Sequence, residues 1–428
     1  MGKKYQIIFY FIIPMLILGI YGGYSTFPIC VFCLVMRLLM SNKDTIGFYL
    51  LMFGGPIAGL IRTCYPFIPI YGVVILFISL LILNKYCIIF FKECKSSIGY
   101  MLLVYMVFFI SYIGAKSTPY ADGKMFDIVY HGSTMLFAFY IYSKSTKISS
   151  EHLSQLLLLT TIVYIVGYIT IHRFSVGTIF DYDWLRSNFE YYRKLEDDEI
   201  TGYQKIGMLA LLGYTFFISK KELDIKRFIY YSLVTFQVIM TSGARQAMLG
   251  FMAVVFIRFA FLNDKSFFKK TCYLILSLCL VFVIYLIVMN VGGVYVQSLE
   301  DSGGSGRDLI YLDALRLISI YPLFGVGLGG FPLYSRTADW PHNVILEIIC
   351  ETGFVGLGVL SIIVFIFYFS KNISFNVITK NNNYYFLIIV ALAIRYMISC
   401  DLGDSIELFS VFFAAAPLKN NRCINNKY

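Results

Sequence analysis

Long apolar runs recur from one end of this chain to the other, and they constrain its fold more than any other feature. A run of ~20 mostly apolar residues is long enough to cross a bilayer as a helix. Of the 428 residues, 59% are hydrophobic and only 14% are charged, which is typical of a membrane protein. The sequence therefore predicts an all-α polytopic membrane protein, with residues 1–428 forming a single integral membrane domain.

The apolar runs predict about fourteen membrane helices, or about twelve if the short pairs near the two ends do not each form two spans. No small-residue cleavage site follows the first run, so we expect a span there and not a signal peptide. Every second connecting loop is rich in lysine, which by the positive-inside rule places both termini in the cytoplasm. The predicted spans are 6–24, 26–41, 46–62, 66–84, 98–115, 125–143, 152–171, 202–219, 227–242, 245–262, 271–290, 342–368, 384–400 and 404–417.

Two long segments, 172–201 and 291–341, are then expected to face the outside. Arginine on the side that disfavours positive charge has two explanations of equal weight. The guanidinium groups pair with acidic side chains of the same loops, or they recognise an anionic group, since the guanidinium fork matches phosphate geometry. The arginines are Arg173, Arg186 and Arg193 in the first segment and Arg307, Arg316 and Arg336 in the second.

Residues 307–320 have the pattern of an amphipathic helix lying at the outer interface. Leucine or isoleucine at 309, 312, 315 and 318 forms an apolar stripe, and Arg307, Asp308, Tyr311 and Arg316 fall elsewhere on the helical wheel. A lid packed on the helix bundle is the simpler alternative. Either reading makes this helix the main ordered element of the second outer segment.

The stretch PLFGVGLGGFP matches the dinucleotide-binding pattern at Gly325, Gly327 and Gly330. That pattern requires a preceding strand and a following helix of a βαβ unit, and neither is expected here. Glycine flanked by Pro322 and Pro332 instead predicts tight turns in which the backbone is approached closely.

His342 is the candidate general base. It follows Pro341, a residue favoured in the first turn of a helix, so we expect His342 at the outward N-terminus of the span 342–368. The positive end of the helix dipole disfavours a charged imidazole, and a neutral histidine can accept a proton. The same free amide groups attract anions. A histidine that only caps a loop remains the alternative.

Further polar residues gather in the outer half of the expected membrane helices. Asn343, Glu347 and Glu351 are spaced by four residues and share one helix face. An ion path would spread polar groups through the whole depth of the membrane, whereas this pattern favours a site open to the outside. The other residues at this level are Arg245, Arg395, Asp401, Asp404 and Glu407.

Neither a metal, a cofactor nor a nucleic acid is expected. Asp181 and Asp183 have the form of a metal-binding pair, but acids in a tyrosine-rich loop are more often solvated or paired with arginine. Cys30 and Cys33 form a C-x-x-C inside an apolar run, where buried core thiols are the better interpretation. The net charge of +10 is scattered over short loops and forms no basic stripe.

Four motifs together resemble a known family. SGRDL, PLFGVGLG and PHNVILEIICETGFVGL resemble the shared C-terminal signature of the bacterial O-antigen polymerases and O-antigen ligases, and TSGARQAMLG resembles an arginine-bearing segment that precedes it there. The resemblance implies a membrane glycosyltransferase of the GT-C type, with two large periplasmic loops, in the bacterial inner membrane. Its implied donor and acceptor are undecaprenyl diphosphate-linked oligosaccharides, and a flippase and a chain-length regulator are implied partners beside the membrane lipid.

The resemblance also implies roles for individual residues. His342 corresponds to the proposed base, and Arg245 and Arg307 correspond to arginines that hold the diphosphate. Weaker substrate-binding candidates are Arg316, Arg336, Asn343, Glu347 and Arg395. The wording around Glu347 favours an O-antigen polymerase, which joins repeat units, over a ligase, which transfers the glycan to lipid A-core. A polysaccharide flippase is the weaker alternative, because no internal repeat is visible.

Overall fold

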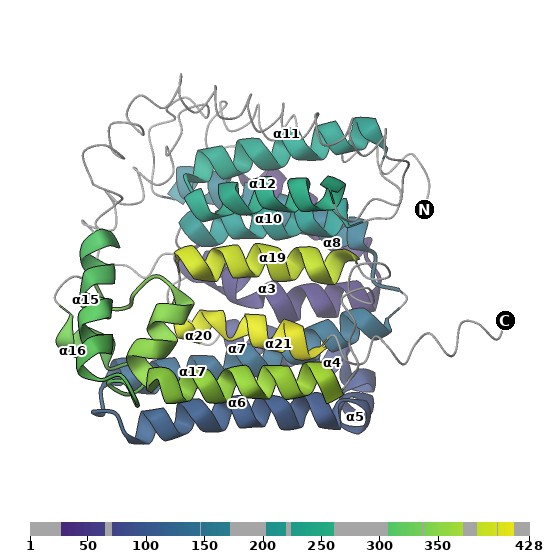
Figure 1. The fold of residues 1–428 in the computed structure, drawn as a ribbon. Helices are drawn as coiled ribbons and strands as arrows, with labels where there is room; N and C mark the ends of the chain where they lie inside the picture. Colours follow the sequence, from purple (N-terminus) through teal and green to yellow (C-terminus); the bar gives the residue numbers. More distant parts are fainter. Residues whose placement is uncertain are drawn as a thin grey trace. The chain divides into compact units, whose positions relative to one another are not determined.

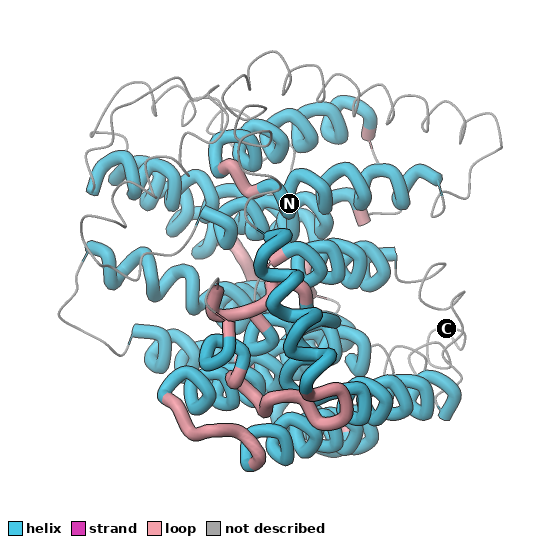
Figure 2. Tube along the Cα trace, turned by 60° about the vertical axis from the view of Figure 1, so that its left-hand side comes forward, coloured by secondary structure: helices cyan, strands magenta, loops and turns pink. Residues whose placement is uncertain are grey.

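The computed structural model describes residues 27–64, 71–145, 147–171, 203–219, 224–260, 307–335, 338–370, 383–399 and 401–414. Within these ranges all regular structure is helical, as Figure 2 shows. The helices form two compact units. The predicted spans 6–24 and 271–290, the outer segment 172–201, the acidic pair at 181 and 183, and residue Arg336 lie outside the described residues.

The first unit is built around two helices that are buried along most of their length, α8 (Ser150–Ile171) and α10 (Tyr203–Ile218). A helix that is apolar all round belongs in the interior of a bundle. Gly213 lets them approach closely, since a Cβ there would lie 3.0 Å from the Cβ of Leu157. The surrounding helices are α2 (Phe27–Leu39), α3 (Lys43–Cys64), α4 (Tyr71–Ile82), α11 (Ile225–Ser242) and α12 (Arg245–Ala260).

The second unit carries most of the candidate site. Its long helices α6 (Lys95–Ile113), α7 (Pro119–Lys144) and α17 (Val344–Ser370) run alongside one another, and α15 (Arg307–Ile320) lies across the end of α17 (Figure 1). The remaining helices are α5 (Asn84–Glu93), α16 (Phe331–Tyr334), α19 (Asn383–Ile398), α20 (Leu402–Ser405) and α21 (Glu407–Ala414).

Each predicted span that falls on described residues coincides with a helix, except 404–417, whose described residues are divided between α20 and α21. Two of these helices, Lys95–Ile113 and Val344–Ser370, are long and apolar enough to cross a membrane. A third candidate is the pair Gly72–Ile82 and Asn84–Glu93, which is bent by 78°. The expected lysine-rich loop after residue 84 was wrong, because those residues are helical. The span count and the single membrane domain stay predictions.

Helix α15 has the bounds that the sequence predicts, and it packs on the protein through a face other than the leucine stripe. Ile310, Ala314 and Leu317 are buried against α16 and α17, in a cluster that includes Phe331 and Cys350. Leu309, Leu312 and Leu315, which the sequence places at the membrane interface, are each more than half exposed. Both faces of the helix are apolar, so helical periodicity alone could not identify the buried one.

Helix α17 is broken at Gly353, which has φ 70° and ψ −177°. This region of backbone conformation is essentially restricted to glycine. A break leaves amide and carbonyl groups without partners, and burying them unpaired is costly. The loop before α16 pairs with them: Val326 N–H donates to the carbonyl of Cys350 at 2.8 Å, and Gly327 N–H to that of Glu351 at 3.0 Å. On the other side of the break, Phe354 N–H donates to Pro322 O at 2.8 Å.

The glycines of the loop make this pairing possible. Gly325, Gly327 and Gly329 all have positive φ. A Cβ at Gly325 would lie 2.5 Å from the Cys350 carbonyl oxygen, and one at Gly329 would lie 2.7 Å from Cα of Ala121. The prediction of tight turns with close backbone approach is confirmed, and the closely approached partners are the broken helix at Gly325 and the start of α7 at Gly329.

We expect Gly353→Ala to destabilise the protein by on the order of 1–3 kcal/mol or more. The added Cβ would overlap the Leu323 carbonyl, and an L-residue disfavours this conformation. Gly358→Ala in the same helix is the matched control, because no atom lies within 4 Å of its added Cβ. Thermal unfolding of the detergent-purified variants measures both. Equal melting temperatures for the two variants would contradict a structural role for the break.

Candidate functional site

The N-terminus of α17 differs from the expected arrangement in one respect. The helix begins at Val344, and Asn343 is its cap: the side-chain oxygen of Asn343 accepts from the N–H groups of Ile345 and Leu346 at 3.0 and 3.2 Å. The Asn343 side-chain amide also donates to the carbonyl of Met397 at 3.2 Å. We had expected His342 in the first turn of this helix. It instead precedes the cap residue Asn343.

His342 has a left-handed backbone, with φ 55°, the only positive φ of a non-glycine residue that the described ranges contain. Such a conformation is uncommon for a side chain with a Cβ and often marks a functional position. The imidazole lies beside the indole of Trp340, with 5.1 Å between the ring centroids. Its Nδ1 is buried and has no hydrogen-bond partner among the described residues.

Electrostatics keep this imidazole neutral. Burial, and to a smaller extent the positive charge of Arg307, lower the pKa of His342 to about 4, and Asp339 opposes this shift. The positive end of the α17 dipole acts in the same direction as Arg307. His342 can therefore accept a proton throughout the neutral pH range, and an anion bound near Arg307 would make it a stronger base.

Arg307 is the first residue of α15, and the structure brings it near His342, although the two are 35 positions apart in the chain. Arg316 lies on an exposed part of the same helix and donates to the carbonyl of Tyr334 at 3.2 Å. Asp313 accepts from the Ser335 hydroxyl at 3.0 Å. These two bonds attach α15 to the end of α16.

A buried charge cluster lies on α17 one turn beyond its cap. Lys124 of α7 donates to Glu347 at 2.5 Å and to Glu351 at 2.7 Å, and all three side chains have no exposed surface. The same oxygen of Glu347 accepts from the N–H of Leu402 at 3.0 Å. The second carboxylate oxygens of both glutamates have no partner within the described residues. Glu347, a predicted substrate-binding residue, is thus withdrawn from solvent.

Lys124 is the residue that sequence reasoning missed. It lies just before the predicted span 125–143, on the side expected to face outward, where the positive-inside rule disfavours lysine. Lys116 and Lys124 both lie there against that bias, and the position of Lys124 at the very start of the span was the available signal. What the sequence could not provide was the pairing of the two helices.

Arg395 of α19 is engaged by acids of its own unit. It donates to Asp404 at 3.2 Å, and Glu407 lies 3.6 Å from its other terminal nitrogen. The hydroxyl of Tyr396 donates to Glu407. The charge of Arg395 is therefore largely compensated without a substrate, and its predicted substrate-binding role stays a prediction.

Arg245 belongs to the first unit and is described by itself. It is the first residue of α12 and follows the left-handed Gly243 that ends α11, whose N–H bonds to carbonyls of the last turn. This is the usual way to end a helix sharply and begin another. The guanidinium is half-buried at the N-terminus of its helix, an end that attracts anions.

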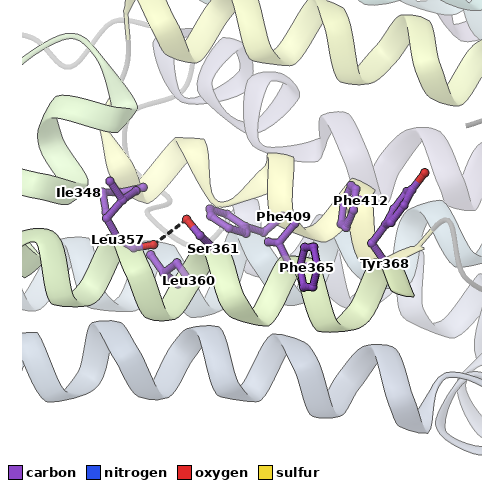
Figure 3. Close-up of a pocket in the computed structure, with 9 residues that line it drawn as sticks. Ile348, Leu357, Leu360, Ser361, Phe365, Tyr368, Phe409 and Phe412 are labelled. Atoms are coloured by element: carbon purple, nitrogen blue, oxygen red, sulfur yellow. Dashed lines mark hydrogen bonds between the residues drawn. The ribbon is translucent and has the colours of Figure 1, made fainter. Parts of the chain in front are cut away.

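An open apolar groove of about 450 Å³ runs along α17 beside α21 (Figure 3). The hydroxyl of Ser361, one of the lining residues, donates to the Leu357 carbonyl at 2.8 Å. The groove lining contains no charged side chain. The two charged residues of α17, Glu347 and Glu351, lie near the N-terminal end of that helix. The groove is lined by Ile348, Leu357, Leu360, Ser361, Val364, Phe365, Tyr368, Phe409 and Phe412.

Three chemical capacities result from this geometry. His342 can accept a proton, Arg307 can hold an anion close to it, and α15 and the cap of α17 fix both residues on ordered backbone. In the described part of the chain, no group of three His, Cys, Asp or Glu side chains is arranged to hold a metal ion.

Comparison with known families agrees with this arrangement. Residues 230–361 match the model of a family described as O-antigen ligase. A comparison with curated proteins finds no match. The matched stretch contains Arg245, Arg307, His342, Glu347 and the break at Gly353. Over these residues the chain is similar to the O-antigen polymerase/ligase superfamily, and its long apolar helices are those expected of a membrane protein.

Proposed function

We propose that this protein is an O-antigen polymerase of the GT-C type, which joins undecaprenyl diphosphate-linked repeat units at the periplasmic face of the inner membrane. The observation that carries the proposal is a neutral, strained His342 beside Arg307, inside the stretch that matches the family. Both termini would lie in the cytoplasm, as the lysine-rich loops predict.

In the proposed reaction a hydroxyl oxygen of the acceptor sugar attacks the anomeric carbon of the donor glycan. The bond from that carbon to the diphosphate oxygen breaks, and its electron pair leaves with the diphosphate. His342 takes the hydroxyl proton as general base, with inversion at the anomeric carbon. Arg307 and Arg245 stabilise the negative charge that develops on the leaving group.

The other candidates have less support. Arg316 lies on an exposed part of α15, where a glycan could contact it, and Arg336 lies outside the described residues. Asn343 already caps α17, and Arg395 is paired with acids, so a contact of either with substrate would be secondary. Glu347 is buried against Lys124, which favours a role in holding the site together.

The ligase is the second candidate, because the matching family model bears that description. We expect a strain that lacks this gene to make lipopolysaccharide with a core that carries one repeat unit and no ladder. His342→Ala expressed at the wild-type level should fail to restore the ladder, and the wild-type gene is the control. A bare core with long glycan accumulating on undecaprenyl diphosphate would identify a ligase. An unchanged ladder would reject both assignments and leave the flippase to be tested.

The pH dependence of kcat/KM tests His342 as the base. Activity requires the neutral imidazole, whose pKa in the free enzyme is lowered to about 4, so kcat/KM should fall only as the pH drops through about 4. Bound diphosphate stabilises the charged imidazole, so the acid limb of kcat should lie at higher pH than that of kcat/KM.

Two variants should shift the acid limb of kcat/KM in opposite directions. Arg307→Gln removes a positive charge that lowers the pKa, so its acid limb should move up, staying below 6.5 because burial is the larger cause. Asp339→Asn removes a charge that raises the pKa, so its limb should move down. Limbs that move together, or an unmoved limb in both variants, would show that another group titrates.

Changing Arg245 or Arg307 to lysine keeps the charge and removes the guanidinium fork. We expect kcat/KM for a lipid diphosphate-linked glycan to fall by about 10- to 100-fold in each variant, because one preorganised donor contributes on this order. Arg227→Lys is the control, since Arg227 pairs with Glu151 and Asp224. Full activity of both site variants would reject bidentate diphosphate binding.

A further inference from the structure

The buried cluster of Lys124, Glu347 and Glu351 is not used by any step of the proposed reaction, yet it lies on the helix that carries His342. We propose that Lys124 is a positioning residue: through the two glutamates it fixes the first turns of α17, and thereby the place of Asn343 and His342. This inference rests on the proposed function, because it assigns a role within the same site.

The contacts of the cluster reach several elements that adjoin the first turns of α17. Lys124 of α7 donates to Glu347, which links α7 to α17. Glu347 also accepts a hydrogen bond from the N–H of Leu402, at the start of α20. The backbone of Glu351 extends the network, since its carbonyl accepts from Ser111 of α6 at 2.8 Å and from Gly327 of the glycine loop at 3.0 Å. The ion pairs thus join α7 and the start of α20 to α17, and the Glu351 backbone adds α6 and the loop before α16.

The connection to His342 runs along α17 itself. The N–H of Glu347 donates to the carbonyl of Asn343 at 2.9 Å, which is the first hydrogen bond of the helix. Asn343 caps that turn, and His342 precedes it with a left-handed backbone that its own preference does not stabilise. Surrounding structure must therefore hold this conformation, and Glu347 is a buried anchor one turn further along the helix.

Burial explains why the lysine is indispensable to this arrangement. Lys124 is the one buried lysine in the described ranges, and it lies between two carboxylates from which water is excluded. Removing one partner of a buried ion pair leaves an uncompensated charge and costs about 3–5 kcal/mol. Replacing all members of a buried ion cluster with well-packed apolar groups of similar volume is often tolerated, and a neutral cluster at least removes the cost of an unpaired buried charge. Comparing removal of the lysine alone with removal of all three charges therefore distinguishes a loss of folded protein from a loss of site positioning.

The experiment compares two variants with the wild type in detergent. Lys124→Met leaves the two buried glutamates without their cation, and we expect little folded protein. Lys124→Met combined with Glu347→Gln and Glu351→Gln removes all charge at nearly constant volume, and we expect the folded yield to recover. In that neutral variant kcat per folded molecule should fall by about 10- to 100-fold, with KM within about twofold, because catalysis is sensitive to displacements of about 1 Å.

A matched control accompanies these variants. Lys144→Met breaks an ion pair with Glu93 at the other end of α7, where the partners are 2.6 Å apart but partly exposed, and kcat should be unchanged. A fall in kcat as large as that of the neutral variant would show that the loss of any ion pair of α7 has this effect, and would overturn the proposal.

A purely structural cluster gives a different result. The neutral variant would then regain folded protein and the wild-type kcat together, which overturns the positioning role. Hydrogen exchange provides a readout that does not depend on the reaction: positioning predicts faster exchange at residues 342–347 in the neutral variant and unchanged exchange elsewhere in α17. Should the wild type transfer no glycan, the proposed function fails, and unchanged exchange at these residues would still reject positioning by itself.

Discussion

The pairing of backbone groups at the break in α17 is the constraint on which the second unit depends. In an apolar environment an interrupted helix is tolerated only where another segment satisfies the groups that the interruption frees. Here the segment is the glycine loop, which exchanges hydrogen bonds with both sides of Gly353. This exchange fixes the loop, and the loop is the connection between α15 and α16. The position of Arg307 relative to His342 follows from that chain of attachments.

Much of this fold could be predicted from the sequence because the signals are local. Apolar runs located the helices, and glycine between prolines indicated a close backbone approach, which the Gly325 and Gly327 contacts confirm. The same local signals did not identify which face of α15 packs on the protein, because both faces are apolar. Helix α15 has leucines on one face and Ile310, Ala314 and Leu317 on another, and only packing distinguishes them.

For the site, the sequence pattern selected residues but not their partners. His342 and Arg307 were selected by type and place, and the structure brings them together. Asn343 was expected to bind substrate but is engaged as a helix cap, and Arg395 is engaged by Asp404 and Glu407. Lys124 was overlooked because its meaning lies in a contact across 223 positions, and no periodicity in the chain reports such a contact.

The backbone of His342 has a consequence for how this region can vary. Asparagine and glycine adopt a φ of 55° more readily than histidine, so a chain selected for stability alone would replace the imidazole. Retaining histidine there costs on the order of 1–3 kcal/mol. The proposed base is therefore the one non-glycine residue with a positive φ in the described ranges, and in that role stability and activity would oppose each other at a single backbone torsion.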